Sequence, residues 1–348
     1  LTLAVLVACG GIWEGGRALA GGEGGLPWEP ELSFGPEGTF TIVHFTDTQD
    51  DQDIDPRTVQ LMEAVLDDQA PDLVVFTGDN IRSGPESAAQ VRQAIDGFSG
   101  PVESRGVPWM VTFGNHDEDH TSLSGMTEAD QLAYCMSLPN NLNQSGPPEV
   151  NGTGNMLLLV GGTDDPTPRL VIWGLDSGRY VPDTIAGQSV SADGLRTYDW
   201  IRPSQVGWYA RTSEALEARV GTKVPGIMFF HIPLPEFGLM WDNRENHGVV
   251  GEKNEDVAAG AFNSGLFGAV KDRGDVVGIF VGHDHINDFV GNYFGVQLGY
   301  SANTGFGTYG LDGDDPDRLR GARVFRVSEE DPGSFETFMV YARDYGIQ

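Results

Sequence analysis

Short apolar runs alternate with amphipathic helical patterns along most of the chain. The apolar runs predict strands at 40–46, 72–77, 108–113, 169–175, 224–230 and 276–281. Apolar residues at helical spacing predict helices at 56–68, 86–98, 203–219 and 260–273. Proteins in which strands and helices alternate in this way usually form layered α/β folds. The pattern therefore predicts an α/β architecture.

The segments outside this alternation are fewer. Residues 289–301 and 323–344 are typical of β-hairpins, and residues 120–165 are expected to be a long polar insertion with weak structure that forms a rim over the site. Residues 21–38 are rich in Gly and Pro, which predicts a linker. The sequence shows neither an internal repeat nor a second domain boundary, so residues 39–348 are expected to form a single catalytic domain.

Residues 1–20 are expected to be the remnant of an export signal, because an uncharged apolar run too short to span a bilayer occupies residues 1–8. Residues 6–9 also resemble the lipobox of bacterial lipoproteins, which predicts a lipid anchor at Cys9. Cleavage after Ala20 and a plain N-terminal strand are the alternatives. Export implies an extracellular or envelope-anchored protein of bacterial type. Cys135 would then be the remaining cysteine, so no intrachain disulfide is expected.

The chain is strongly acidic. It has 348 residues with 51 Asp and Glu against 21 Lys and Arg, which gives a formal net charge of −30. Such a surface repels nucleic-acid backbones and anionic lipid surfaces, so nucleic acid is not expected as a partner. Because the acidic residues are interleaved with apolar runs, the composition does not indicate disorder. A salt-adapted or an extracellular protein fits this charge, and a monomer is expected.

Polar motifs directly follow five of the predicted strands. Sites in open α/β folds lie outside the carboxyl ends of the strands, so side chains from these five loops are expected to converge. The residues are Asp47 and Gln49 after 40–46, Asp79 after 72–77, Asn115 and His116 after 108–113, His231 after 224–230, and His283 and His285 after 276–281.

These side chains offer oxygen and nitrogen donors, which suit Mn, Zn or Fe rather than a thiolate site. Two carboxylates, three imidazoles and two amides suffice for two divalent metal ions if one carboxylate bridges them. Paired metals about 3.5–4 Å apart form the arrangement that clamps a phosphoryl group and activates a water molecule.

The order of these motifs resembles the signature of the calcineurin-like metallophosphoesterases, D-x-[H/Q]…GDN…GNH[D/E]…H…GHxH. The segments PDLVVFTGDNI (71–81), GVPWMVTFGNHDED (106–119) and YDWIRPSQVGWY (198–209) are most similar to the purple-acid-phosphatase-like branch, which includes yeast and plant phosphatases of the Dcr2 type. The resemblance covers roughly residues 38–310. It implies a four-layer α/β/β/α sandwich with mixed sheets.

The resemblance also implies a role for each motif residue. The metal ligands would fall into two sets that share the bridging carboxylate of Asp79: Asp47, Gln49, Asp79 and His285 for the first ion, and Asp79, Asn115, His231 and His283 for the second. His116 is not a ligand in this family. It would lie beside the scissile bond and stabilise or protonate the leaving oxygen.

The chain departs from the family pattern at two points. Most members have histidine where this chain has Gln49, and a neutral amide oxygen is a weaker ligand that favours Mn at that site. The tyrosine ligand of true purple acid phosphatases is also missing, because Arg82 and then Ser, Gly and Pro occupy the positions after the GDN motif. A coloured Fe(III) site is therefore not expected.

Other residues near the motifs are given structural interpretations. Asp50, Asp51 and Asp53 are expected in a solvated loop, and Asp55 is expected to cap the helix that begins at Pro56.

The remaining candidates belong to the core or the rim. His44, inside a strand, is interpreted as structural, and His120 and His247 as loop or rim residues. The glycines of ANTGFGTYG predict a tight loop at the site wall, where Asn303 and Tyr309 could contact substrate.

The resemblance implies a two-metal-dependent phosphoric ester hydrolase with a metal-bridging hydroxide as nucleophile. Its substrate would be a small phosphoester or a phosphoprotein, and monoesters and diesters both stay open. The alternative is a catalytically inactive metal-binding surface or receptor module. Suitable donors at all seven ligand positions, with His116, favour the enzyme. Substrate specificity is expected in the loops 120–165, 177–200 and 232–258, which carry no recognisable motif.

Overall fold

The computed structural model describes residues 29–190 and 197–348. The predicted export signal at 1–20, with Cys9, and residues 21–28 of the predicted linker lie outside the described residues. In the part of the chain that is described, no helix is both long enough and apolar enough to cross a membrane.

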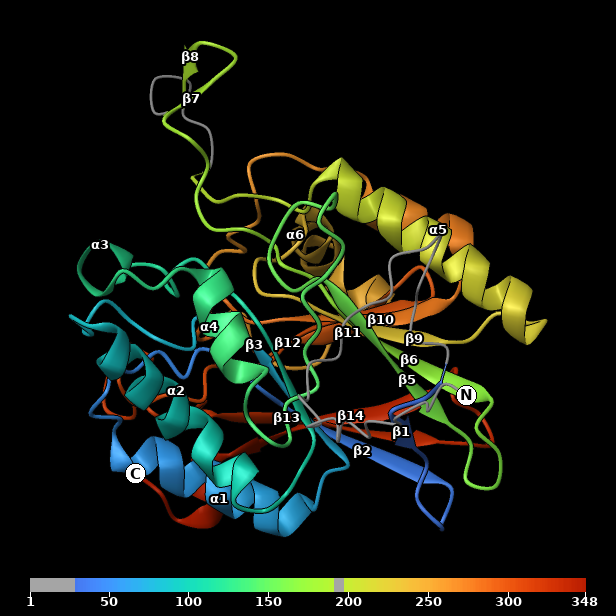
Figure 1. Ribbon diagram of the computed structural model, residues 1–348, viewed down its shortest axis with the longest axis horizontal. Helices are drawn as coiled ribbons and strands as arrows, with labels where there is room; N and C mark the ends of the chain where they lie inside the picture. Colours follow the sequence, from blue (N-terminus) through green and yellow to red (C-terminus); the bar gives the residue numbers. More distant parts are fainter. Residues whose placement is uncertain (1–28, 191–196) are drawn as a thin grey trace, which may run out of the picture.

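The larger of two main sheets has seven strands (Figure 1). Their order is β1 (Leu32–Ser33), β5 (Met156–Gly161), β6 (Pro168–Gly174), β9 (Gly226–Phe229), β10 (Val276–Val281), β12 (Val296–Tyr300) and β11 (Val290–Tyr293). Strands β6, β9, β10 and β12 run parallel, whereas β5 and β11 are antiparallel to their neighbours β6 and β12. The sheet is therefore mixed, and its central strands end at one common edge.

The smaller main sheet has five strands, in the order β14 (Phe335–Tyr341), β13 (Gly321–Ser328), β2 (Thr39–Phe45), β3 (Leu73–Thr77) and β4 (Trp109–Thr112). Strands β2, β3 and β4 are parallel, and β13 pairs antiparallel with both β2 and β14. The hairpins predicted in 289–301 and 323–344 are thus confirmed as β11–β12 and β13–β14.

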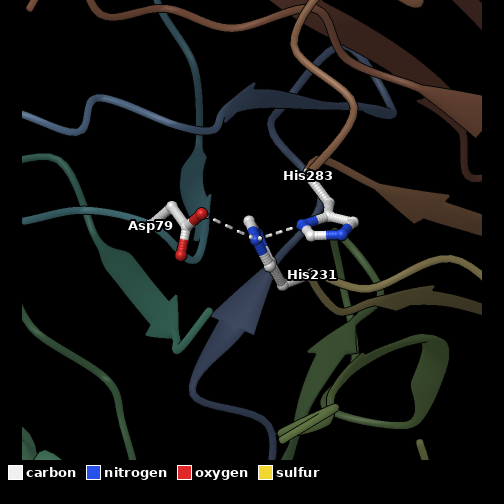
Figure 2. Close-up of side chains that lie close together, drawn as sticks. All are labelled: Asp79, His231 and His283. Atoms are coloured by element: carbon white, nitrogen blue, oxygen red, sulfur yellow. Dashed lines mark hydrogen bonds and ion pairs between the residues drawn. The ribbon is translucent and has the colours of Figure 1, made fainter. Parts of the chain in front are cut away.

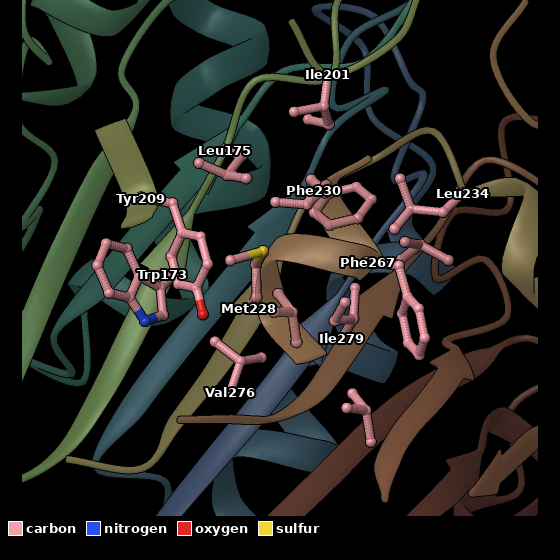
Figure 3. Close-up of a cluster of buried hydrophobic side chains, with 14 of the residues drawn as sticks. Trp173, Leu175, Ile201, Tyr209, Met228, Phe230, Leu234, Phe267, Val276 and Ile279 are labelled. Carbon is pink, nitrogen blue, oxygen red and sulfur yellow. The ribbon is translucent and has the colours of Figure 1, made fainter. Parts of the chain in front are cut away.

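Three apolar cores separate four layers. Helices α1 (Pro56–Gln69), α2 (Ala88–Glu103) and α4 (Glu128–Cys135) pack on the smaller sheet. On the larger sheet lie α5 (Pro203–Val220), α6 (Pro235–Asp242) and α7 (Leu266–Arg273), and Figure 3 shows part of this core around Trp173 and Met228. A third core, with Phe229, Phe280 and Phe325, lies between the sheets. The expected α/β/β/α sandwich is therefore confirmed.

Short elements complete the described chain. They are α3 (Thr121–Ser124), β7 (Thr184–Ile185), β8 (Gln188–Ser189) and the 3₁₀ turns η1 (Arg244–His247) and η2 (Ala342–Tyr345). Strands β7 and β8 form a small hairpin that stands away from the two main sheets at the top of Figure 1. Residues 179–181 and 197–199, at the base of this hairpin, pair with each other next to the motif loops.

Several sequence predictions need correction. The segment 120–165 is not weakly structured throughout, because it contains α4 and the fully buried strand β5. The continuous apolar run MLLLVG lacks the alternation that identifies half-buried strands, since β5 lies inside the sheet and is covered on both faces. Within the predicted linker, Leu32 and Phe34 are buried, and Leu32–Ser33 forms β1.

Two helix predictions were also imprecise. The helix predicted at 260–273 begins only at Leu266, after Gly265 in the left-handed region at φ 84°. Helix α6 was not predicted. The N-terminus of α1 was predicted correctly, because the Asp55 side chain accepts the backbone N–H of Arg57 and Pro56 occupies the first turn.

Candidate metal centre

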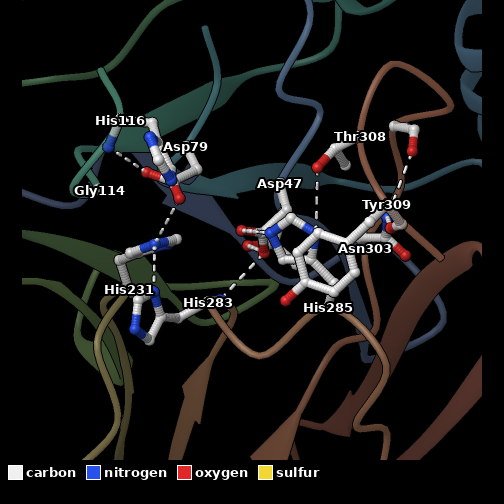
Figure 4. A network of polar contacts seen from close by, with 12 residues as sticks. Asp47, Asp79, Gly114, His116, His231, His283, His285, Asn303, Thr308 and Tyr309 are labelled. Atoms are coloured by element: carbon white, nitrogen blue, oxygen red, sulfur yellow. Dashed lines mark hydrogen bonds and ion pairs between the residues drawn. The ribbon is translucent and has the colours of Figure 1, made fainter. Parts of the chain in front are cut away.

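The motif loops of both main sheets meet at the carboxyl ends of β2, β3, β4, β9 and β10 (Figure 4). All seven predicted ligands lie together here among the buried residues, with exposures of at most 7%. Burial of so many polar side chains is costly unless each finds a partner, so this concentration itself marks a site.

The first group of donor atoms comes from Asp79, His231 and His283 (Figure 2). The Nε2 atom of His231 lies 3.1 Å from Oδ2 of Asp79 and 3.2 Å from Nδ1 of His283. Two ligands of one metal ion, each about 2.0–2.2 Å from it, are separated by roughly this distance. The group therefore has the spacing of a metal site.

The second group comes from Asp47, Asp79 and His285. The Nε2 atom of His285 lies 3.3 Å from Oδ1 of Asp47. The other carboxylate oxygen of Asp47 accepts hydrogen bonds from the Thr46 hydroxyl at 2.7 Å and the His283 backbone N–H at 3.0 Å, which fix its orientation. Asp79 belongs to both groups, as a bridging carboxylate must.

The two amide residues also present suitable oxygens. Oδ1 of Asn115 and Oε1 of Gln49 are buried with no hydrogen-bond partner. The Asn115 side chain is oriented by its Nδ2 group, which donates to the Tyr180 hydroxyl at 2.9 Å. Gln49 is adjacent to Asp79, whose carbonyl accepts the Gln49 backbone N–H at 2.9 Å.

Buried atoms without a hydrogen bond therefore concentrate at this centre. Five of the seven predicted ligands carry one, namely Asp47 Oδ1, Gln49 Oε1, Asp79 Oδ2, Asn115 Oδ1 and His283 Nε2. Asp79 Oδ2 and Asp47 Oδ1 have only the ion-pair contacts with His231 and His285. Buried polar atoms without partners are rare in folded proteins and call for an ion or a water. The donor set of carboxylate, amide and imidazole groups fits divalent metal ions.

Backbone strain is concentrated at the same place. Among the described residues, seven other than glycine have a positive φ, and four of these are predicted ligands: Asp47 at 50°, Gln49 at 36°, Asp79 at 47° and His283 at 75°. Such conformations cost about 1–3 kcal/mol each and persist only where the surrounding structure imposes them. The loops therefore aim these side chains at the expense of local stability.

The electrostatics of the centre are dominated by its buried carboxylates. Burial works against a charged His231 ring, but Asp79 and Asp47 outweigh it and raise the pKa of His231 to about 10. Burial and the charge of His231 together lower the pKa of His283 to about 3. Although burial opposes it, His231 also holds the pKa of Asp79 below its usual range. Without a metal ion, a proton on His231 is what neutralises Asp79.

Metal binding is consequently expected to release protons at neutral pH. His231 is protonated below about pH 10 in the metal-free protein, and a metal ion binds only the neutral ring. Apparent metal affinity should therefore rise with pH between 6 and 9, by about tenfold per pH unit for each proton released. Calorimetric titration with Mn in buffers of different ionisation enthalpy counts these protons. A titration that releases none at pH 7 would contradict the assignment.

Thr77 and Asp117 hold the predicted ligands in place, although the sequence pattern indicated no role for either residue. The Nδ1 atom of His231 lies 2.7 Å from the carbonyl of Thr77 and donates its proton there, which directs Nε2 toward Asp79. Asp117 is fully buried and accepts the backbone N–H groups of Asn80, Ile81 and Gly114, so it ties the two motif loops together. Burial and the charge of Asp79 raise the pKa of Asp117 to about 7.

His116 lies at the edge of the centre, and its backbone N–H donates to Oδ1 of Asp79 at 2.7 Å. Its ring contacts Oδ2 of Asp119 through Nδ1 at 2.5 Å, which leaves Nε2 directed away from Asp119. The guanidinium of Arg179 donates to Oδ1 of Asp119 at 2.7 Å and to the carbonyl of Asn115 at 2.8 Å. The ring is thus oriented by an acidic residue that is itself held by Arg179. Nothing in the sequence pattern marked Asp119 or Arg179.

The loop after β12 forms one wall of the centre, as predicted. A side chain at Gly305 would place its Cβ 1.9 Å from the carbonyl oxygen of Thr48, so the loop packs there without room for any other residue. Asn303 is buried, and its side-chain amide donates to the carbonyls of Gly305 and Tyr309, which gives it a structural role in this loop. Tyr309 is half exposed and stacks on His285 at 4.1 Å.

Two other predictions were wrong in part. Asp50 is buried rather than solvated and accepts the backbone N–H of Asp55 at 2.7 Å. His120 is buried rather than on a rim, with Nδ1 2.8 Å from the Ser124 hydroxyl. The structural interpretation of His44 is confirmed, because its buried ring contacts the Thr77 hydroxyl. His247 lies in η1, where its Nδ1 contacts the Asn292 carbonyl.

Comparison with known proteins assigns the family. The profile of the calcineurin-like phosphoesterases matches residues 40–287, which include all seven predicted ligands and His116. The chain belongs to the calcineurin-like phosphoesterase family. Members of this family use a dimetal centre, and the two groups of candidate ligands that share Asp79 agree with that property.

Individual relatives agree with this assignment. The chain is 31% identical over 312 residues to "Probable inactive purple acid phosphatase 14" of Arabidopsis thaliana, covering 81% of this chain and 75% of the relative. It is 32% identical over 250 residues to "Phosphatase DCR2" of Saccharomyces cerevisiae, covering 68% of this chain and 39% of that one. A dimetal phosphatase from Danio rerio shares the fold, with a TM-score of 0.51 and 13% identity over 87% of this chain and 99% of that one.

Proposed function

We propose that this calcineurin-like phosphoesterase is an active two-metal phosphoric ester hydrolase. The observation that supports the proposal is the two groups of donor atoms that share Asp79, together with buried oxygens of Gln49 and Asn115 that have no hydrogen-bond partner. Asp47, Gln49, Asp79 and His285 would hold one ion, and Asp79, Asn115, His231 and His283 the other. Mn, Zn and Fe all suit these donors, and Gln49 favours Mn at the first site.

Two such ions, when bound, supply Lewis acidity toward a phosphoryl group and its attacking water. The protein's own residues orient that chemistry. Asp79 fixes the separation of the two ligand groups, because one carboxylate serves both. The Thr77 carbonyl orients the His231 ring, and the Tyr180 hydroxyl orients the Asn115 amide, so both side chains are held in fixed orientations.

We infer that the Nε2 atom of His116, on the side of the ring away from Asp119, serves the leaving oxygen. Its Nδ1 contacts Oδ2 of Asp119 at 2.5 Å, which orients the ring. A proton on Nε2 can pass to the leaving oxygen as the phosphorus–oxygen bond breaks, or donate a hydrogen bond to its developing charge. His116 is therefore the proposed general acid.

The inactive metal-binding module is the competing proposal, and the name of the Arabidopsis relative gives it weight. The deciding experiment is hydrolysis of p-nitrophenyl phosphate by the purified chain, stripped with a chelator and then supplied with Mn or Zn. Turnover that depends on added metal and is lost in Asp79→Asn supports the hydrolase. Stoichiometric metal binding without turnover of any mono- or diester supports the inactive module.

Gln49 is expected to make the first metal site the weaker one. A neutral amide oxygen donates less strongly than imidazole and suits harder ions, so this site should empty first on mild chelation and refill best with Mn. Gln49→His should tighten it and shift its preference toward Zn or Fe. Gln49→Ala should raise the Mn concentration needed for half-maximal activity by about tenfold or more, with a smaller effect on the rate at saturating Mn.

These expected metal affinities are checked by measuring activity against Mn and Zn concentration for the parent and both variants. Asp47, Asp79 and His285 still hold the ion in Gln49→Ala, so saturating metal should restore turnover. If Gln49→Ala follows the parent curve for both metals, Gln49 is not a ligand.

A further inference from the structure

Three tyrosines lie against the histidines of the centre. The Tyr198 ring meets His283 edge to face, with ring centroids 4.3 Å apart at 88°, and stacks on Tyr180 at 5.7 Å and 28°. On the other side, the Tyr309 ring lies flat over His285, at 4.1 Å and 10° (Figure 4). Each candidate ligand group therefore has an aromatic ring packed against one of its histidines.

Two of these three rings are exposed. Tyr180 is 42% exposed and Tyr309 is 51% exposed, so both present part of their aromatic surface to solvent at the edge of a polar centre. Large exposed aromatic surface beside a catalytic centre is a common feature of ligand subsites, because aromatic rings bind ligands with little loss of conformational entropy.

The tyrosines are held in fixed positions by polar contacts. The Tyr180 hydroxyl accepts from Asn115 at 2.9 Å, and the Tyr309 hydroxyl donates to Oε2 of Glu255 at 2.8 Å. Tyr180 and Tyr198 face each other across an antiparallel bridge, with the Val181 N–H bonded to the Thr197 carbonyl beside it. A platform held in this way needs no ordering when a ligand binds, which favours affinity.

The charges around the tyrosines restrict what could bind there. Glu255 lies beside Tyr309, Asp119 lies beside His116, and Glu118 lies beside Arg179. The cations near Tyr180 and Tyr198 are already paired: Arg179 contacts Glu118 and Asp119 at 3.3 Å and 2.7 Å, and Arg202 contacts Asp199 at 2.7 Å. A leaving group with its own negative charge would therefore meet carboxylates whose neighbouring cations are already engaged.

We propose that Tyr180, Tyr198 and Tyr309 form a leaving-group subsite for a flat aromatic ring that carries no further negative charge. The substrate class is then an aryl phosphate monoester, with its phosphate at the metal centre and its ring stacked on the tyrosines. This inference rests on the proposed hydrolase function. It adds a selectivity that the metal ligands alone would not produce, because they contact only the phosphoryl group.

A purely structural role is the rival explanation, in which the tyrosines only cover the histidines. The two explanations differ in what they affect. Covering residues would change metal affinity and the turnover of all phosphoesters alike. Loss of a leaving-group subsite would lower kcat/KM for aryl phosphates and leave kcat/KM for small alkyl phosphates nearly unchanged.

The test compares phenyl phosphate with methyl phosphate in the metal-loaded parent, Tyr198→Leu and Tyr309→Leu. Each variant should lose about tenfold or more in kcat/KM for phenyl phosphate, the range of a lost stacking contact, and stay within about twofold for methyl phosphate. Taking variant-to-parent ratios for each substrate removes the intrinsic difference between the two leaving groups. Tyr198→Phe should retain aryl selectivity. 4-Carboxyphenyl phosphate should be a poorer substrate than phenyl phosphate.

Phe294→Leu is the matched control. Phe294 is an exposed aromatic residue in the β11–β12 turn, at the opposite end of β12 from the centre. Its replacement should leave kcat/KM unchanged for both phenyl and methyl phosphate. Equal losses for phenyl and methyl phosphate in the tyrosine variants would overturn the subsite and favour the covering role.

A binding measurement separates this inference from the proposed function. Phenylphosphonate should bind the metal-loaded parent at least about tenfold more tightly than methylphosphonate, and Tyr198→Leu should abolish the difference. Absence of turnover together with this preference would reject the hydrolase and keep the aromatic subsite. Turnover together with equal phosphonate affinities would keep the hydrolase and reject the subsite.

Discussion

Replacing Asp79 with alanine is expected to remove both metal ions and to lower hydrolysis by more than about a thousandfold, because one carboxylate contributes to both ligand groups. The loss should exceed that from any residue of a single group. Asp79 also neutralises His231, so its removal leaves the rings of His231 and His283, with nitrogens 3.2 Å apart, without that carboxylate. Elemental analysis after gel filtration gives the metal content, and p-nitrophenyl phosphate gives the activity.

Asp53→Ala provides the matched control. It removes the same charge from an exposed position in the adjacent acidic loop and should leave metal content and turnover unchanged. Circular dichroism of both variants shows whether the fold is retained. A folded Asp79→Ala protein that still holds two ions per chain would rule out the bridging role.

Replacing His116 with alanine is expected to preserve both metal ions while turnover falls by about two or more orders of magnitude, as the loss of a general acid does. Its side chain contacts Asp119 rather than either ligand group, so metal content should not change. The loss should be larger for substrates with poor leaving groups such as methyl phosphate than for p-nitrophenyl phosphate, because nitrophenolate departs without a proton.

His247→Ala is the corresponding control, because His247 lies in η1 and packs against Tyr293 of β11, away from the centre. Rates for a series of aryl phosphates in parent and His116→Ala give the dependence on leaving-group acidity. An equal loss for good and poor leaving groups would show that His116 stabilises charge electrostatically rather than donating a proton.

The sequence by itself determined the layered α/β class and the residues that converge. Strands such as 40–46 and 72–77 are short apolar runs that are followed directly by the loops carrying Asp47 and Asp79, and parallel strands bring their carboxyl ends to one edge. The motif order then indicated the calcineurin-like family, which the family profile confirms. This succeeded because periodicity and motif spacing are local properties of the chain.

Only the tertiary structure decided which residues support that centre. Strand β5 has a continuously apolar run like that of β3, but it was missed because the long segment around it, 120–165, is polar and was treated as one insertion. Asp119 and Arg179 lie 60 positions apart, and Tyr309 meets His285 from a different loop, so no local pattern could pair them. Burial likewise made Asp50 and His120 core residues although their sequence neighbourhoods are polar. Contacts between distant segments depend on how the sheets pack, and that information is absent from any single stretch of sequence.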